Sequence, residues 1–96
     1  MTVRITDDAE ADIETGFWFY ESQSLGLGEY FRSSILTDID SLAFFGGVHP
    51  KVRDWHCVQA KRFPIAIYYE CDGTSVTVVA VLDARRNPSW IERKLD

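Results

Sequence analysis

The stretch RFPIAIYYECDGTSVTVVAVLDARRNPSW, residues 62–90, decides the fold of this chain. Its two runs of β-branched and aromatic residues, 63–71 and 76–82, flank Asp72-Gly73, and this pattern predicts an antiparallel hairpin with a tight turn. Pro64 stands at the beginning of the first run, where a strand tolerates proline. Paired arginines follow the second run, and Pro88 suits the first turn of a short helix over residues 88–95. The sequence therefore predicts a sheet whose last strand ends in a cationic cluster.

The N-terminal half predicts a short strand over residues 3–6 and two helices near residues 7–23 and 29–45. Asp7 and Glu10 have the spacing of a capping box at the start of the first helix. The glycines of residues 24–28 separate the two helices, and Gly46-Gly47 ends the second. Each helix carries an apolar stripe. The stripes are Ala9, Ile13, Phe17 and Tyr20, and Phe31, Ile35, Ile39 and Leu42. They predict an antiparallel helix hairpin with one buried face.

Residues 48–54 are expected to form a loop, and residues 55–60 a further strand. The resulting order β-α-α-β-β-β-α predicts an α+β fold in one domain, residues 1–96. The helix hairpin packs on a mainly antiparallel four-stranded sheet, because neither layer can bury its apolar face alone.

The last strand is apolar on both sides. Simple alternation places Val76, Val78, Ala80 and Leu82 on one side and Val79 and Val81 on the other. A strand with two apolar faces needs two covers. The helix hairpin supplies one, and either the final helix or a partner protein completes the other.

Composition limits the possible functions. The 96 residues carry a net charge of −5, unevenly placed. Residues 1–48 hold nine acidic and two basic side chains, and residues 49–96 hold six acidic and eight basic ones. A globally acidic chain is a poor general nucleic-acid binder, so only a local basic patch could contact phosphate. No apolar run approaches a membrane span, and the first residues lack an apolar signal core. We therefore expect no membrane partner and a cytoplasmic location.

No motif predicts a cofactor, a metal site or a nucleophilic catalyst. Cys57 and Cys71 are expected to be free thiols in a reducing compartment, and neither lies in a cluster with metal-ligand spacing. His49 and His56 are expected on a loop or strand surface. The serines lack an evident His/Asp arrangement.

Three runs of this chain resemble the RelE/ParE superfamily of bacterial toxin–antitoxin modules. They are DI…YE (12–13, 20–21) leading to GLG…F (26–28, 31), RFP…IYY (62–64, 67–69) and VLDARRNPSW (81–90). The resemblance implies a growth-inhibiting toxin, of the kind found in plasmid stabilisation systems, that forms a hetero-oligomer with a cognate antitoxin. In the ParE branch the implied target is DNA gyrase, and in the RelE branch it is messenger RNA on the ribosome.

RNA cleavage through the 2′-hydroxyl needs a base, an acid and cations near the developing charge. By resemblance, the ribonuclease branch places such groups at the positions of Cys57, Gln59 and Ala66, none of which is a cation. The chain is therefore predicted to be ParE-like and not an enzyme, and its catalytic residues are unknown. A ribosome-dependent mRNA endonuclease with substituted residues and a non-toxic binding module with the same fold remain as alternatives.

The candidate functional patch consists of Arg53, Arg62, Arg85, Arg86 and Trp90. Arginine offers a planar donor fork that suits phosphate or carboxylate. Adjacent residues in an extended segment face opposite ways, so Arg85 and Arg86 are expected to point apart. The alternative is a solvated strand end with salt bridges to Asp83 and Glu92. Trp90 could equally serve to pack the final helix on the sheet.

Overall fold

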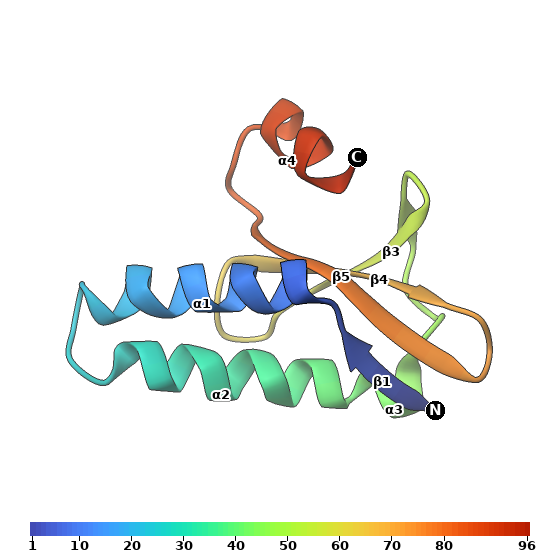
Figure 1. Ribbon diagram of the computed structural model, residues 1–96, viewed down its shortest axis with the longest axis horizontal. Helices are drawn as coiled ribbons and strands as arrows, with labels where there is room; N and C mark the ends of the chain where they lie inside the picture. Colours follow the sequence, from blue (N-terminus) through green and yellow to red (C-terminus); the bar gives the residue numbers. More distant parts are fainter.

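A computed structural model describes residues 1–96, in which two helical layers enclose one sheet (Figure 1). The elements are β1 (Thr2–Ile5), α1 (Asp7–Glu21), α2 (Leu27–Asp40), α3 (Leu42–Phe45), β2 (Lys51–Val52), β3 (Trp55–Gln59), β4 (Ile65–Cys71), β5 (Ser75–Asp83) and α4 (Pro88–Leu95). The strand order is β1-β5-β4-β3-β2. Only β1 runs parallel to its neighbour, and the other pairs are antiparallel. The predicted α+β class and the helix hairpin are confirmed.

The sheet has five strands and not the predicted four. The additional strand is β2, which lies inside the predicted loop 48–54 and pairs with the beginning of β3. Arg53, in the turn between β2 and β3, has a φ of 59°, in the left-handed region that glycine and asparagine usually occupy. Because this turn contains neither residue, the sequence carries no hairpin signal here.

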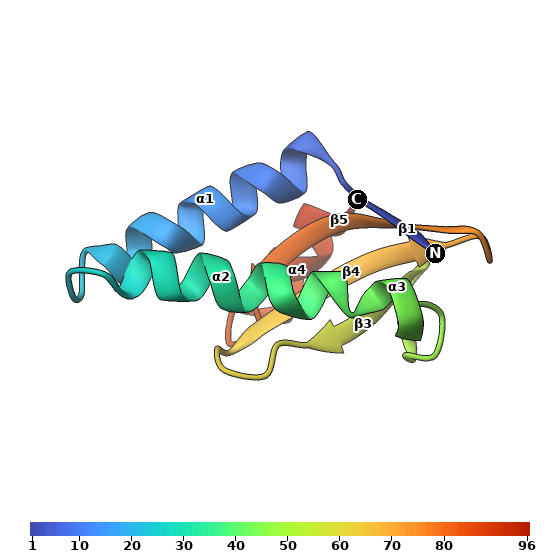
Figure 2. The same cartoon turned by 90° about the horizontal axis from the view of Figure 1, so that it is seen from below.

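The first helix begins at Asp7 as predicted and ends two residues early, whereas α2 begins at Leu27, two residues before the predicted start. Thr6, not Asp7, caps α1, and its hydroxyl oxygen accepts the Ala9 N–H at 3.1 Å. The predicted second helix is divided at Ser41 into α2 and α3. Gly47 has the expected left-handed conformation, with a φ of 93°. The chain reversal near residues 22–26 sets α1 and α2 side by side, and they diverge toward β1 (Figure 2).

The stripe of the second helix is fully buried, whereas the stripe of the first is buried except at Phe17. Phe17 is half-buried at the surface, where the Arg32 guanidinium lies over its ring, 4.1 Å from the centroid. Gly16 explains how closely the helices approach. A Cβ atom there would lie 2.5 Å from the Phe31 ring, so any other residue would force the ring or the helices to shift.

A bulge divides the last strand between the two faces of the sheet. Tyr68 pairs with Ala80 and Tyr69 with Val78, which leaves Val79 as an extra residue. Val76 and Val78 therefore face the hairpin, but Ala80 faces α4. The predicted alternation along β5 is wrong beyond the bulge.

Both apolar faces are covered within the chain. The helix hairpin and the sheet bury thirteen residues together. On the opposite face, Ala66, Tyr68, Ala80 and Leu82 are each at most 5% exposed and cluster with Leu95 of α4. Of the two covers considered from the sequence, α4 is the one that buries these residues.

Candidate functional site

Arg85 and Arg86 follow β5 and differ sharply in their partners. The Arg85 guanidinium donates two hydrogen bonds to the Asp83 carboxylate, from Nε at 3.0 Å and from Nη2 at 2.9 Å. These bonds are the main reason that the pKa of Asp83 lies below its usual value. The charge of Arg85 is thus largely balanced, and the predicted salt bridge to Asp83 is confirmed for this arginine.

Arg86 has no carboxylate partner and stacks on Trp90. Its guanidinium carbon lies 4.0 Å from the Trp90 ring centroid, and the Lys94 ammonium lies 5.8 Å from the same centroid. A guanidinium that lies above the face of an indole ring is stabilised by a cation–π interaction. Trp90 is half-buried and also packs on the cluster beneath α4. Arg86, Trp90 and Lys94 together form what we call the α4 cation face.

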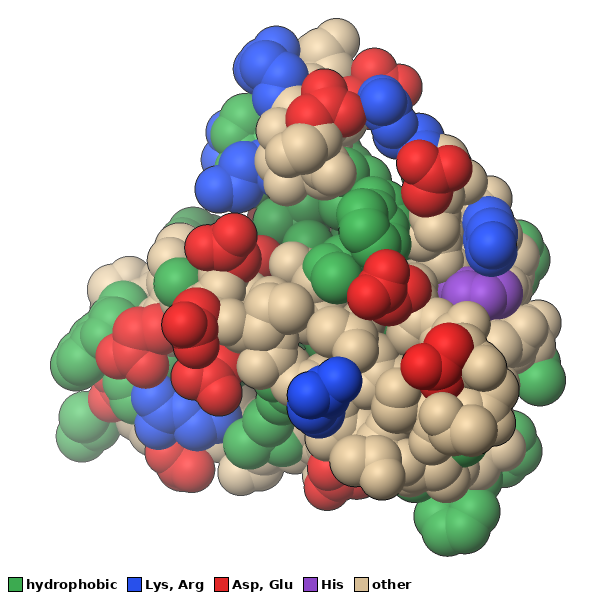
Figure 3. All heavy atoms as spheres, turned by 45° about the vertical axis from the view of Figure 1, so that its right-hand side comes forward, with side chains coloured by type: hydrophobic (Ala, Val, Ile, Leu, Met, Phe, Trp, Pro, Cys, Tyr) green, Lys and Arg blue, Asp and Glu red, His purple; other side chains and the backbone are tan.

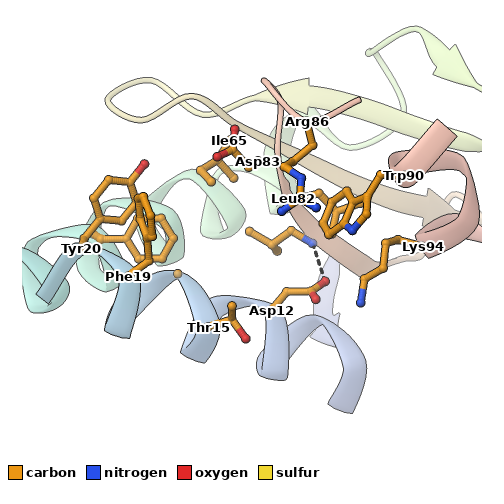
Figure 4. A pocket seen from close by; sticks show the side chains of 13 residues that line it. Asp12, Thr15, Phe19, Tyr20, Ile65, Leu82, Asp83, Arg86, Trp90 and Lys94 are labelled. Atoms are coloured by element: carbon orange, nitrogen blue, oxygen red, sulfur yellow. Dashed lines mark hydrogen bonds between the residues drawn. The ribbon is translucent and has the colours of Figure 1, made fainter. Parts of the chain in front are cut away.

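A cleft separates the α4 cation face from α1 (Figure 4). Its volume is about 230 Å³. The α1 wall contributes Asp12, Thr15, Phe19 and Tyr20, and the opposite wall contributes Asp83, Arg86, Trp90 and Lys94. The cleft therefore combines aromatic surface with one carboxylate on each wall and two cations on the wall opposite α1.

Asp12 connects α1 to the bulged strand at the base of this cleft. Its carboxylate accepts the Val81 N–H at 3.0 Å, just after the bulge interrupts the β4–β5 pairing. Burial raises the pKa of Asp12, against the opposing effects of this hydrogen bond and of Lys94. Sequence reasoning did not identify this role, because Asp12 and Val81 lie far apart in the sequence and meet only where β5 extends beyond its pairing with β1.

The remaining candidate arginines lie on other loops. Arg62 is exposed on the β3–β4 loop, at the same end of the sheet as Arg85, since the Ala84 N–H donates to the Pro64 carbonyl oxygen there at 2.9 Å. Arg53 lies in the β2–β3 turn and pairs instead with Asp96, after the end of α4, at 3.0 Å. The structure thus groups Arg62, Arg85, Arg86 and Trp90 at one end and separates Arg53 from them.

The sheet face beneath α4 offers no cation. Cys57 is half-buried opposite Tyr68, and Ala66 is 1% exposed. Burial raises the pKa of the Cys57 thiol and, with Cys57 as a further cause, raises the pKa of Tyr68 to about 12. Neither group readily exchanges a proton near neutral pH. Gln59, at the end of β3, is exposed.

In the view of Figure 3, basic and acidic side chains are mixed at the top of the molecule, and acidic side chains gather at the left beside a basic group and hydrophobic side chains. Exposed aromatic side chains near the tip of the hairpin include Trp18, Phe19 and Tyr30, each at least 50% exposed.

Cys57 and Cys71 are free. No cluster of three or more His, Cys, Asp or Glu side chains could hold a metal ion, and none of the helices is long and apolar enough to cross a membrane.

No protein-family model and no curated protein matches this sequence. A search of solved structures finds a similar chain in the "Chromosomal ParDE TA system from P. aeruginosa", with a TM-score of 0.74 and 15% sequence identity. The match covers 88% of this chain and 97% of that chain. The two chains therefore share their fold over most of their length, which confirms the fold that the sequence predicted.

Proposed function

We propose that this chain is the toxin component of a type II toxin–antitoxin module and that a cognate antitoxin neutralises it in the cytoplasm as a hetero-oligomer. The observation that carries the proposal is the agreement in fold with the ParDE chain over nearly the whole of both molecules. Fold alone does not define function, so the argument also depends on the surfaces.

The α4 side of the sheet favours a ParE-like toxin, acting on DNA gyrase or another target, over a ribonuclease. A phosphorane transition state needs cations directed at the charge that develops. The residues at the corresponding positions are Cys57, Gln59 and Ala66, and Leu95 of α4 packs over this face. Because Ala66 and Tyr68 are buried there, a ribose-phosphate backbone would have no charged partner on the face.

A binding module of the same fold without toxicity is the second candidate. The Arg85–Asp83 pair favours it, because it balances the charge of one of the two arginines at the end of β5. Arg86, Lys94 and Arg62 are then among the cations that form no salt bridge at this end of the molecule.

The antitoxin contact is supported by the hydrophobic side chains that the chain leaves exposed. Trp18, Phe19 and Tyr30 near the hairpin tip are accompanied by Leu25, which is 95% exposed in the α1–α2 connection. Exposed aromatic and aliphatic surface of this kind commonly marks a protein interface. We therefore place the antitoxin contact on the helix hairpin, with the sheet face already covered by α4.

Induced expression in a bacterial host tests the proposal. Growth should stop, and the neighbouring gene should encode a small protein whose co-expression restores growth and yields a co-purifying complex. A DNA-damage response should accompany arrest, without cleavage of translated messages. Codon-position cuts on messages without DNA damage would establish a RelE-type endonuclease instead. A stable complex without growth arrest would establish the non-toxic module.

A further inference from the structure

Tyr69 ends in a hydroxyl group that lies beneath residues 46–52, the segment between α3 and the β2–β3 turn. The side chain is fully buried. Its Oη accepts the Gly47 N–H at 2.9 Å and lies 2.6 Å from Nδ1 of His49. His56 of β3 stacks on the Tyr69 ring at 5.0 Å, and its Nδ1 lies 2.6 Å from the His49 carbonyl oxygen.

The protons in this network can be assigned from its donors and acceptors. Gly47 N–H can only donate, so the hydroxyl hydrogen of Tyr69 needs another acceptor, and Nδ1 of His49 is the one within reach. His49 must then be neutral, with its hydrogen on Nε2. The His49 carbonyl can only accept, so His56 must carry a hydrogen on Nδ1. The two histidines therefore respond differently to acid, because a second proton breaks a hydrogen bond only at His49.

We infer that His49, Tyr69 and His56 form a pH-sensitive latch that holds residues 46–52 against the edge of the sheet near neutral pH and releases them in acid. A protonated His49 would place two donors, Nδ1–H and the Tyr69 hydroxyl, against each other. Turning the hydroxyl hydrogen away would leave it without an acceptor in a buried position, which is unfavourable.

The surroundings of His49 provide no counter-charge for a proton. His56 approaches it from β3 and Tyr69 from β4, and neither histidine forms a salt bridge with a carboxylate. Cys71, also on β4, lies beneath Gly47, and its thiol contacts Met1, whose ammonium group donates to the Ala43 carbonyl of α3.

Lys51 and Glu70 also lie nearby, but neither supplies a counter-charge for a protonated His49. Lys51 of β2 is cationic and would repel a protonated imidazole. Glu70 lies between Tyr69 and Cys71 and is exposed, on the other face of the sheet because side chains alternate along a strand.

The direction of the pH dependence follows from these contacts. Burial, and secondarily the charge of His56, lowers the pKa of His49 below its ordinary value of 6.5. The released segment therefore binds a proton more readily than the latched one. The latched form is therefore most stable, relative to the released form, at pH values above the ordinary imidazole pKa. Its relative stability decreases as the pH drops below that value, and the decrease ends below the pKa of His49 in the latched form.

Release would expose the outer edge of β3. The segment covers this edge through the β2–β3 pairing and through the bond from the Cys57 N–H to the Pro50 carbonyl oxygen at 3.0 Å. The edge would then present unpaired backbone groups, a template for strand addition.

Amide hydrogen exchange on the intact chain tests the latch. Protection factors, corrected for intrinsic exchange rates, should fall for the Gly47 and Cys57 amides between about pH 7 and about pH 5, by up to roughly tenfold per pH unit for one linked proton. Protection within the β4–β5 pairing should not change. Imidazole nitrogen spectra near pH 7 should show the Nε2–H tautomer for His49 and Nδ1–H for His56. Constant protection in the wild type, or the Nδ1–H tautomer at His49, would overturn the proposal.

Matched histidine variants separate the latch from general acid sensitivity. His49→Asn retains an acceptor near the position of Nδ1 but cannot take up a proton, so the protection of Cys57 should become independent of pH. His56→Asn retains a donor to the His49 carbonyl, so the pH dependence should persist. If His49→Asn kept the full pH dependence, another group would control the segment and the proposal would be wrong. The spectra of the wild type decide the question even if a variant fails to fold.

Discussion

The two faces of the sheet differ greatly in how many residues they bury. The helix hairpin and its side of the sheet bury thirteen residues, whereas α4 and the opposite side bury five. The hairpin is made of two helices that pack on each other as well as on the sheet, but α4 is one helix of eight residues near the end of the chain. The hairpin face therefore stabilises the fold, and the α4 face can present charged side chains at a smaller loss of stability.

The largest expected effect lies on the hairpin face. Phe31→Ala should cost roughly 3–5 kcal/mol, because Phe31 is fully buried between α1, α2 and the β3–β4 loop. Urea unfolding measures the loss. Tyr30→Ala, at a neighbouring residue that is 51% exposed, is the matched control and should cost much less. Equal losses for the two variants would show that this face is not the main source of stability.

A smaller loss is expected from the α4 face. Leu95→Ala should cost about 2 kcal/mol, the lower end for a buried leucine, since the last turn of a terminal helix can rearrange around the vacated space. Leu95 is 8% exposed and packs in the five-residue cluster. The same unfolding experiment applies. A cost equal to that of Phe31→Ala would remove the difference between the two faces.

The sequence predicted the hairpin face better than the α4 face. The stripes of the two helices are local patterns, and seven of their eight residues are buried as expected. Phe17 is the exception: it is half-buried at the surface, where the guanidinium of Arg32 from the other helix lies over its ring. The Asp72-Gly73 turn and Pro88 at the start of α4 were also local signals, and both predictions were right.

The features that the sequence did not predict depend on contacts between distant residues. The bulge opposite Tyr68 and Tyr69 moves Ala80 to the α4 face, and alternation along β5 alone gives no sign of it. Strand β2 depends on pairing with β3 through a turn without glycine or asparagine. For the candidate site, sequence placed Arg85, Arg86 and Trp90 together, but only the structure distinguishes the balanced Arg85 from the unpaired Arg86.

Asp12 lies where the two faces meet, and its removal should cost less stability than either of these core truncations. Asp12→Ala leaves the Val81 N–H without its acceptor, so it should cost roughly 1 kcal/mol, the low end for an unsatisfied buried donor beside a cleft. Asp12→Asn keeps an oxygen acceptor and should cost less. Because burial raises the pKa of Asp12, the wild type should gain stability relative to Asp12→Asn as the pH falls toward the ordinary aspartate pKa. Thermal unfolding at several pH values checks both differences, and equal costs for the two variants would exclude the hydrogen bond as their cause.

The smallest effect on stability, and the sharpest on function, is expected at the end of β5. Arg86 is exposed and its removal should change stability by less than about half a kcal/mol. If the α4 face carries the toxic activity, Arg86→Ala should abolish growth arrest, because it removes the arginine of the Arg85–Arg86 pair that no carboxylate balances. Arg85→Ala should weaken arrest less, since the Asp83 carboxylate already holds that guanidinium.

Arg4→Ala, at an exposed arginine on β1 away from the cleft, controls for lost charge, and antitoxin binding reports whether each variant is folded. If Arg85→Ala abolished arrest and Arg86→Ala did not, the Arg85–Asp83 pair would have to open when the target binds, and the α4 cation face would not be the effector surface.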